Sequence, residues 1–322
     1  MTLIEKIMIG RIEVQNRLVM PPMQTNKTDR GHVTDALVAY YRERAVGSRP
    51  GIIITEHSCI ASDARAAETQ LSIATDDMIA EHRRLTDAIH EGGCKAFVQL
   101  NHAGSNGIDE PVSASNVSIP VKELLKRPRA LTIGEIKAIE DLYADAARRA
   151  IQAGYDGVEI HCAHAYLLNQ FYSPLTNKRT DEYGGTLENR LRFTLETVQK
   201  VRKAVGEDIP VAVRLGGADY LPGGSKEEDA VQAAVLLEKA GVDLLDVSGG
   251  MCFFMRLGHL EPGYFSSMTE KIKQEVTIPV LLTGGIKKPQ DAERLLVEGK
   301  ADLIGVGRAL MKDANWGGSW NE

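Results

Sequence analysis

The feature that most constrains the fold of this 322-residue chain is a series of eight short apolar segments, each followed by a longer helical pattern. The segments are almost continuously apolar, which is typical of parallel strands buried on both faces. They span residues 17–23, 51–56, 95–100, 157–161, 210–215, 243–248, 279–284 and 302–307. Eight strand–helix units in about 300 residues predict an α/β fold, a (β/α)8 TIM barrel that forms one domain over residues 1–322.

The regions between these segments carry signals for helix starts and for a hairpin. Thr132 with Glu135, and Ser225 with Glu228, have the spacing of a capping box. The segment "KIMIGRIEV" alternates around Gly10 and predicts an N-terminal β-hairpin that closes one end of the barrel. No G-x-G-x-x-G follows the first strand, which disfavours an open doubly wound sheet.

Composition excludes several classes of function. The formal net charge is −6, whereas a nucleic-acid partner requires clustered Lys and Arg. No apolar run approaches the roughly 20 residues of a membrane span, and charges interrupt the N-terminus where a signal peptide would be apolar. The four cysteines are scattered and form no C-x-x-C pair, so we interpret them as free thiols of a cytoplasmic protein.

Two connections, residues 101–131 and 162–187, are unusually long. Both follow the C-terminal ends of predicted strands, the face where barrel enzymes build their active sites. Loops of this length inside a compact domain are more often functional than not. We therefore expect the functional residues at the ends of the strands.

Glycines follow the last two predicted strands. Gly284, Gly285 and Gly307 would let backbone amides approach a phosphate, and Arg308 adds a charged donor. The pattern favours a ligand or cofactor that carries a phosphate. The alternative is that the glycines only form tight turns and Arg308 is solvated.

Two polar residues stand at the ends of otherwise apolar strands. Arg214 ends the fifth strand, where it would bind an anion or belong to an ion pair. Gln99 offers both a donor and an acceptor, as recognition of an amide-like ring edge requires. Either residue could instead be a satisfied part of the core.

The segment "EIHCAHAYLLNQFYSP" places His161, His164 and Tyr166 at the end of the fourth strand. A metal site would need a further ligand, for which Glu159 is the nearest candidate. A second interpretation is that both imidazoles are structural. The third is that two neutral imidazoles bind one substrate oxygen and stabilise negative charge on it, while the Tyr166 hydroxyl supplies a proton.

The stretch "EIHCAHAYLLNQFYSPLTNKRTDEYGGTLENRLRF", residues 159–193, resembles the Old Yellow Enzyme family of FMN-dependent oxidoreductases. Further similar segments follow the family's order along nearly the whole chain. They are "NRLVMPPM", "VQLNHAG", "VRLGGADY", "LLTGGI" and "DLIGVGRALMKD".

The resemblance implies a TIM barrel with FMN at its mouth, reduced by NADH or NADPH. The reduced flavin would pass hydride to the β-carbon of a small activated alkene, an α,β-unsaturated carbonyl or nitro compound. His161 and His164 would bind the activating oxygen, and Tyr166 would protonate the α-carbon. The resemblance is compatible with a homo-oligomer and implies no nucleic-acid or membrane partner.

The resemblance also assigns residues to the cofactor. Gln99 would bind the pyrimidine edge of the flavin, and Arg214 would lie beside N1 and O2, where negative charge collects on reduction. The backbone of Pro22 and Met23 would line the ring. The phosphate would be held by Gly284, Gly285, Gly307 and Arg308.

The chain departs from the family pattern at four places. Gln24 stands where Thr or Cys usually contacts flavin O4, and His57 stands where a small residue is common. We expect both to lie at the cofactor. The iron–sulfur segment and the second flavin or dinucleotide domain of larger relatives are not expected, which counts against C–N bond oxidation as the alternative activity. Only "NWGGSWNE" follows the last predicted helix, so the chain is either truncated or more open on that side.

The sixth-strand loop, residues 248–265, is apolar and is expected to overhang the cofactor. Met251, Phe253, Phe254 and Met255 would form a wall for a bulky substrate or would cover the barrel rim. A metal-dependent barrel hydrolase or lyase that uses the histidine pair is the competing function from another class.

Overall fold

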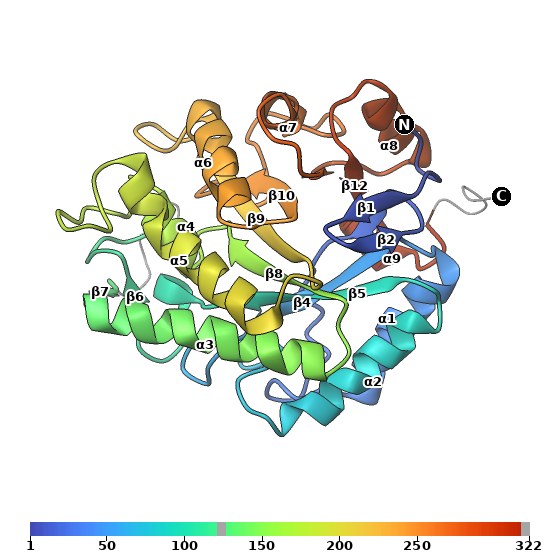
Figure 1. The fold of residues 1–322 in the computed structure, drawn as a ribbon, viewed down its shortest axis with the longest axis horizontal. Coiled ribbons are helices and arrows are strands. Elements are labelled where there is room, and N and C mark those ends of the chain that lie inside the picture. The colour runs from blue at the N-terminus through green and yellow to red at the C-terminus, as the bar shows by residue number, and fades with distance from the viewer. Residues whose placement is uncertain (121–126, 317–322) are drawn as a thin grey trace.

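The computed structural model describes residues 1–120 and 127–316 and contains a closed barrel of eight parallel strands (Figure 1). The predicted TIM barrel is therefore confirmed. In the order in which neighbours pair around the barrel, the strands are β3 (Leu18–Met20), β4 (Ile52–Cys59), β5 (Lys95–Asn101), β8 (Gly157–Cys162), β9 (Val211–Ala218), β10 (Leu244–Gly249), β11 (Val280–Thr283) and β12 (Leu303–Gly305).

Helices follow the strands and cover the outside of the barrel (Figure 1). They are α1 (Asp35–Gly47), α2 (Met78–His90), α3 (Ile133–Gln152), α5 (Leu187–Val205), α6 (Glu227–Lys239), α7 (Ser266–Lys273), α8 (Pro289–Val297) and α9 (Arg308–Lys312). A short extra helix, α4 (Leu167–Tyr172), lies in the long connection after β8. None of the helices in the described ranges is long and apolar enough to cross a membrane.

The N-terminal hairpin closes one end of the barrel, as predicted. Its strands are β1 (Ile7–Ile9) and β2 (Ile12–Val14), which pair in antiparallel register. Ile9 and Val14 are completely buried in a cluster with apolar residues from the barrel strands, including Phe97 of β5. Because the hairpin fills this end, the opposite end is the one that can admit a ligand.

Several local predictions need correction. The capping box of Thr132 and Glu135 forms, but α6 is capped by Lys226, whose backbone amide donates to Asp229 Oδ2 at 2.8 Å. Ser225 lies one residue before the cap position, and its amide donates to Asp219 Oδ2 at 2.9 Å.

Two strands, β4 and β9, extend three residues beyond their predicted ends. Arg214 lies in the middle of β9 rather than at its end. The second strand continues to Cys59, with a shift of register between Thr55 and Ser58. His57 lies in this irregular stretch, and bulges of this kind re-aim side chains near active sites.

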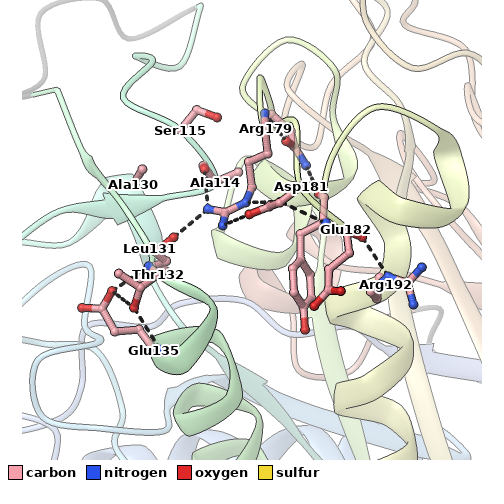
Figure 2. A network of polar contacts seen from close by, with 12 residues as sticks. Ala114, Ser115, Ala130, Leu131, Thr132, Glu135, Arg179, Asp181, Glu182 and Arg192 are labelled. Carbon is pink, nitrogen blue, oxygen red and sulfur yellow. Dashed lines mark hydrogen bonds and ion pairs between the residues drawn. The ribbon is translucent and has the colours of Figure 1, made fainter.

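The two long loops after β5 and β8 are tied together by Arg179 (Figure 2). The first loop contains the 3-10 turn Gly104–Asn106 and the short strands β6 (Val112–Ser113) and β7 (Arg129–Ala130). Arg179, from the second loop, donates to the carbonyl oxygens of Ala114 at 3.1 Å and Leu131 at 2.6 Å. Its guanidinium also makes two hydrogen bonds to the Asp181 carboxylate, which hold it in place.

Candidate active site at the mouth of the barrel

A cavity of about 1510 Å³ opens at the C-terminal end of the barrel. All thirteen residues that the sequence predicts for the site contribute to its wall, although their individual roles remain predictions. They are Pro22, Met23, Gln24, His57, Gln99, His161, His164, Tyr166, Arg214, Gly284, Gly285, Gly307 and Arg308. Residues as far apart as 22 and 308 meet here because parallel strands all end on one face.

The imidazole rings of His57, His161 and His164 form a cluster with the Tyr166 phenol. The ring centroids of His161 and Tyr166 lie 5.0 Å apart, those of His161 and His164 5.1 Å, and those of His57 and Tyr166 5.4 Å. Burial holds the pKa of both His161 and His164 well below the usual range, so these rings are neutral at pH 7. Burial also raises the pKa of Tyr166 to about 12, so its hydroxyl remains protonated.

The turn after β8 is strained. His164 and Ala165 have φ angles of +56° and +59°, a left-handed region that costs non-glycine residues about 1–3 kcal/mol each. Asn169 and Gln170 of α4 hold this turn: Asn169 Oδ1 accepts from the Ala165 amide at 2.9 Å, and Gln170 Nε2 donates to the Ala165 carbonyl at 2.6 Å. Neither residue was predicted for the site. Their amide side chains are buried and support the turn without lining the cavity.

Ser248, at the end of β10, was also missed as a site residue. Its hydroxyl oxygen is hydrogen bonded to His164 Nε2 at 2.7 Å. His161 Nδ1 is buried without a hydrogen-bond partner among the described residues. The two imidazoles therefore differ, since one nitrogen of His164 is held by the protein and His161 is less constrained.

A layer of buried polar groups crosses the barrel interior next to the cavity. Gln99 Nε2 donates to Glu159 Oε1 at 2.8 Å, and Arg214 Nε lies 3.1 Å from Asp246 Oδ2. Thr283 Oγ1 donates to the other oxygen of Asp246 at 3.2 Å. Burial raises the pKa of both carboxyl groups, and that of Glu159 rises well above its usual range. Arg214 thus lines the cavity and belongs to an ion pair at the same time.

The glycine-rich end of the cavity is shaped for close approach. Gly284 and Gly285 have φ angles of +139° and +69°, and a Cβ on either would lie less than 3 Å from the Tyr264 ring. A Cβ on Gly307 would lie 3.0 Å from Met23 Sδ. Only residues without side chains therefore keep this end open, with the exposed Arg308 beside it. The donor set fits a phosphate.

The residues around Gln24 form a small network of their own. Gln24 Nε2 donates to Asn26 Oδ1 at 3.0 Å, so the amide that departs from the family pattern is partly occupied. The next residue, Thr25, donates from its amide and its hydroxyl to Glu56 at 2.5 and 3.0 Å. Burial raises the pKa of Glu56 to about 7, while burial and the nearby Arg214 charge lower the pKa of His57 to about 4.

The predicted apolar wall forms only in part. Phe253 and Phe254 line the cavity, and the Phe254 ring packs edge-on against His164 with centroids 6.2 Å apart. Met251 is buried below the loop and Met255 is half exposed, so neither contributes to the wall. The pKa of the Cys252 thiol is raised to about 12 by burial, so it is not a reactive thiolate.

The hydrogen-bond donors at the two ends of the cavity fit the two ends of the predicted flavin mononucleotide. One end offers the Gln99 amide and the Arg214 guanidinium to a ring with polar edges. The other offers open glycine amides and Arg308 to a phosphate. Within the described residues no group of three or more His, Cys, Asp or Glu is placed to hold a metal ion.

Comparison with known proteins gives matches over almost the whole chain. The model of the NADH:flavin oxidoreductase / NADH oxidase family matches residues 2–319. The chain is 41% identical over 320 residues to the NADH oxidase of Thermoanaerobacter brockii, which covers 96% of this chain and 49% of that protein. It is 37% identical over 311 residues to the NADPH dehydrogenase of Geobacillus sp. (strain WCH70), with 96% and 90% covered. The chain thus spans about half the length of the first relative and most of the second.

Solved structures agree with these matches. A complex of 2-naphthoyl-CoA reductase with 2-naphthoyl-CoA has a TM-score of 0.92 at 28% identity, over 98% of this chain and 51% of that one. The old yellow enzyme homologue from Zymomonas mobilis has a TM-score of 0.84 at 28% identity, over 98% and 90%. Morphinone reductase has a TM-score of 0.84 at 29% identity, over 96% and 86%.

Proposed function

Because this chain belongs to the NADH:flavin oxidoreductase / NADH oxidase family, we propose that it reduces the C=C bond of activated alkenes with electrons from NADH or NADPH. The family confirms the predicted class of enzyme, an oxidoreductase, with FMN as cofactor. The proposal concerns what the family leaves open: the substrate class and the roles of individual residues.

The ring cluster at the end of β8 is the observation that carries the proposal. His161 and His164 are neutral, and neutral imidazoles donate hydrogen bonds to a carbonyl or nitro oxygen without adding a full charge. As a substrate accepts hydride at its β-carbon, negative charge develops on that oxygen, and preorganised donors stabilise it. His161 is the freer donor, whereas Nε2 of His164 is already hydrogen bonded to Ser248.

Tyr166 would supply the proton at the α-carbon. Its ring lies 5.0 Å from that of His161, so a substrate held by the imidazole comes within reach of the phenol. Its raised pKa keeps the hydroxyl protonated until a strongly basic centre forms. Phe253 and Phe254 would cover the substrate and exclude water from this end of the cavity.

The remaining predicted residues would hold the cofactor. When bound, FMN would accept hydride from the nicotinamide and pass it to the alkene. Gln99 and Arg214 would orient its ring, with the backbone of Pro22 and Met23 along the ring face. Gly284, Gly285, Gly307 and Arg308 would hold the phosphate. His57 and Gln24 would border the ring, with Gln24 restrained by Asn26.

Two other activities were open from the sequence. A metal-dependent hydrolase or lyase is set aside, because the family is one of oxidoreductases. Oxidation of a C–N bond is an activity that family membership alone leaves possible. The structural neighbours named morphinone reductase and 2-naphthoyl-CoA reductase favour reduction.

A two-part assay tests the proposal. Purified protein loaded with FMN is first mixed with NADH or NADPH without oxygen, and the flavin absorbance should bleach. A simple enone or a nitroalkene is then added to the reduced flavin, and a secondary amine is added to a separate sample in which the flavin is oxidised. Reoxidation by the enone or nitroalkene with formation of the saturated product supports alkene reduction. Bleaching of the oxidised flavin by the amine, without reoxidation of the reduced flavin by either alkene, contradicts it.

A further inference from the structure

Two carboxyl groups of the polar layer have no task in the proposed reaction. Glu159 on β8 and Asp246 on β10 are both completely buried. Neither lines the cavity, yet each contacts a residue that does, Gln99 and Arg214 respectively.

The barrel itself fixes these contacts. Gln99 pairs with Glu159 in the register of β5 and β8, and Arg214 pairs with Asp246 in the register of β9 and β10. Directly paired residues on neighbouring strands project to the same side of the sheet. The register of the barrel therefore keeps the members of each pair next to each other.

The charges of this layer do not balance if both carboxyl groups are ionised. One guanidinium would then face two carboxylates in a buried layer, and an uncompensated buried charge costs several kcal/mol. Retention of one proton removes the excess charge. The question is which carboxyl group retains it.

The contacts identify the carboxyl group that retains the proton. Asp246 Oδ2 lies 3.1 Å from Arg214 Nε in an ion pair without hydrogen-bond geometry, and Asp246 Oδ1 accepts a hydrogen bond from Thr283 of β11. The charge of Arg214 and the Thr283 hydrogen bond both favour the ionised form of Asp246. Glu159 meets only the neutral Gln99 amide, through Oε1, and its Oε2 has no hydrogen-bond partner within the described part of the chain. The groups that act on Glu159 are Gln99 from β5, Arg214 from β9 and Asp246 from β10.

We infer that Glu159 is a positioning residue that stays protonated in the folded protein, holds the Gln99 amide by accepting from Nε2, and leaves Arg214 and Asp246 as a balanced pair. Gln99 Oε1 is then free to accept from an N–H group at the cavity. The part of this inference that concerns FMN rests on the proposed function, whereas the protonation of Glu159 does not. The expected consequence is a site without excess negative charge, in which a reduced flavin is not disfavoured.

The first test needs no cofactor. Thermal unfolding of the FMN-free protein is followed from pH 5 to pH 8 for wild type and Glu159→Gln, which mimics a protonated carboxyl. As pH rises above the ordinary Glu pKa, the unfolded wild-type chain ionises while the folded chain keeps its proton, so wild type loses stability relative to the variant. The advantage of Glu159→Gln should therefore grow from pH 5 to pH 8. A difference that stays constant or shrinks with pH overturns the inference.

The second test measures the midpoint potential of bound FMN at pH 7. Glu159→Gln should leave it unchanged, because no charge is removed. Adding Asp246→Asn to Glu159→Gln should raise it, because Arg214 then faces the flavin without its counter-charge and no second carboxyl group can ionise in its place. An upward shift in Glu159→Gln alone means that Glu159 was ionised, and no further shift in the double variant means that Asp246 was neutral; either result contradicts the inference. If Glu159→Gln does not fold, the infrared C=O stretch of a buried protonated carboxyl group at pH 7 in wild type decides: its presence supports the inference and its absence overturns it. Failure of wild type to bind FMN refutes the proposed function instead, and the unfolding test still reports on Glu159.

Discussion

His164 is held by both its backbone and its side chain. Its left-handed φ angle turns the chain at the end of β8, and its amide donates to the Gly249 carbonyl at 3.2 Å. Its Nε2 is hydrogen bonded to Ser248 of β10. Local strain of this kind is stored where surrounding structure fixes a functional group. The imidazole is thus placed before a substrate arrives.

Substitution of His164 should weaken the binding of phenols, which resemble the enolate form of a reduced enone. We expect His164→Ala to raise the dissociation constant of a simple phenol at least about tenfold, since a hydrogen bond to a charged oxygen contributes about 1.5–3 kcal/mol. Titration of the flavin absorbance measures this constant. His82→Gln is the control, because His82 is buried away from the cavity between Ser72 and Tyr155. Equal phenol affinities in wild type and His164→Ala would remove the oxyanion role.

Among single residues, the sequence was most informative about polar and charged side chains within apolar strands, because such side chains are rarely buried. Gln99 and Arg214 stood out because amides and guanidiniums are rare within apolar strands, and the family resemblance then assigned them to the cofactor. The contacts of Glu159 and Ser248 were not predicted, because their partners, Gln99 and His164, lie 60 and 84 positions away. Such pairings depend on strand register, which local patterns do not contain.

Among the elements, the two long loops after β5 and β8 depend on each other. Arg179 binds two carbonyl groups of the first loop from its position in the second, as Figure 2 shows. Its side chain is only about 10% exposed. The first loop also brings Ser105 and Asn106 to the cavity wall, so the loops share the task of closing the site.

Loss of Arg179 should loosen this connection. We expect Arg179→Ala to lower the free energy of unfolding by about 2 kcal/mol or more, because Asp181 and two carbonyl groups lose a buried partner. Chemical denaturation measures the loss, and amide hydrogen exchange should quicken at residues 104–115. Arg148→Ala is the matched control, since the Arg148–Asp145 pair on α3 is half exposed and contributes at most about 1 kcal/mol. Similar losses in both variants would argue against a special role for Arg179.

The order and type of the strands were predictable because buried parallel strands are continuously apolar. The residues at which the strands end were less predictable. Arg214 was placed at a strand end because a charge usually stops an apolar run, yet β9 continues to Ala218 since Asp246 neutralises that charge inside the barrel. Likewise, β4 continues past Glu56 because Thr25 and Tyr41 satisfy its polar groups. The end of the sequence, residues 317–322, lies outside the described residues, and so does the prediction made for it.

For the whole molecule, buried neutral histidines make the fold sensitive to acid. The pKa values of His57, His82 and His102 are each lowered to about 4, chiefly by burial. Below the ordinary His pKa of about 6.5, the unfolded chain binds protons that the folded chain does not, so stability falls as pH drops from 6.5 to 4. Carboxyl groups with raised pKa values, among them Glu56, Glu140 and Glu159, act in the opposite direction and offset part of the histidine contribution.

We therefore expect the melting temperature between pH 6.5 and pH 4 to fall further in wild type than in His82→Gln, which lacks one of these histidines. Calorimetry across this range measures the slope. In His82→Gln the slope should be shallower by about one proton, because Gln does not titrate. A slope that is the same in wild type and His82→Gln would show that His82 is not held neutral by the fold.

The central claim is that Tyr166 delivers the proton during alkene reduction, and it is tested most directly by separating the two half-reactions in Tyr166→Phe. Stopped-flow absorbance would record reduction of the bound flavin by NADH or NADPH, and then its reoxidation by an enone. The proposal predicts flavin reduction close to the wild-type rate and reoxidation slowed by about 10²- to 10⁴-fold, the usual contribution of a general acid. Reoxidation at the wild-type rate would contradict the proposal and would assign the proton to another group or to solvent.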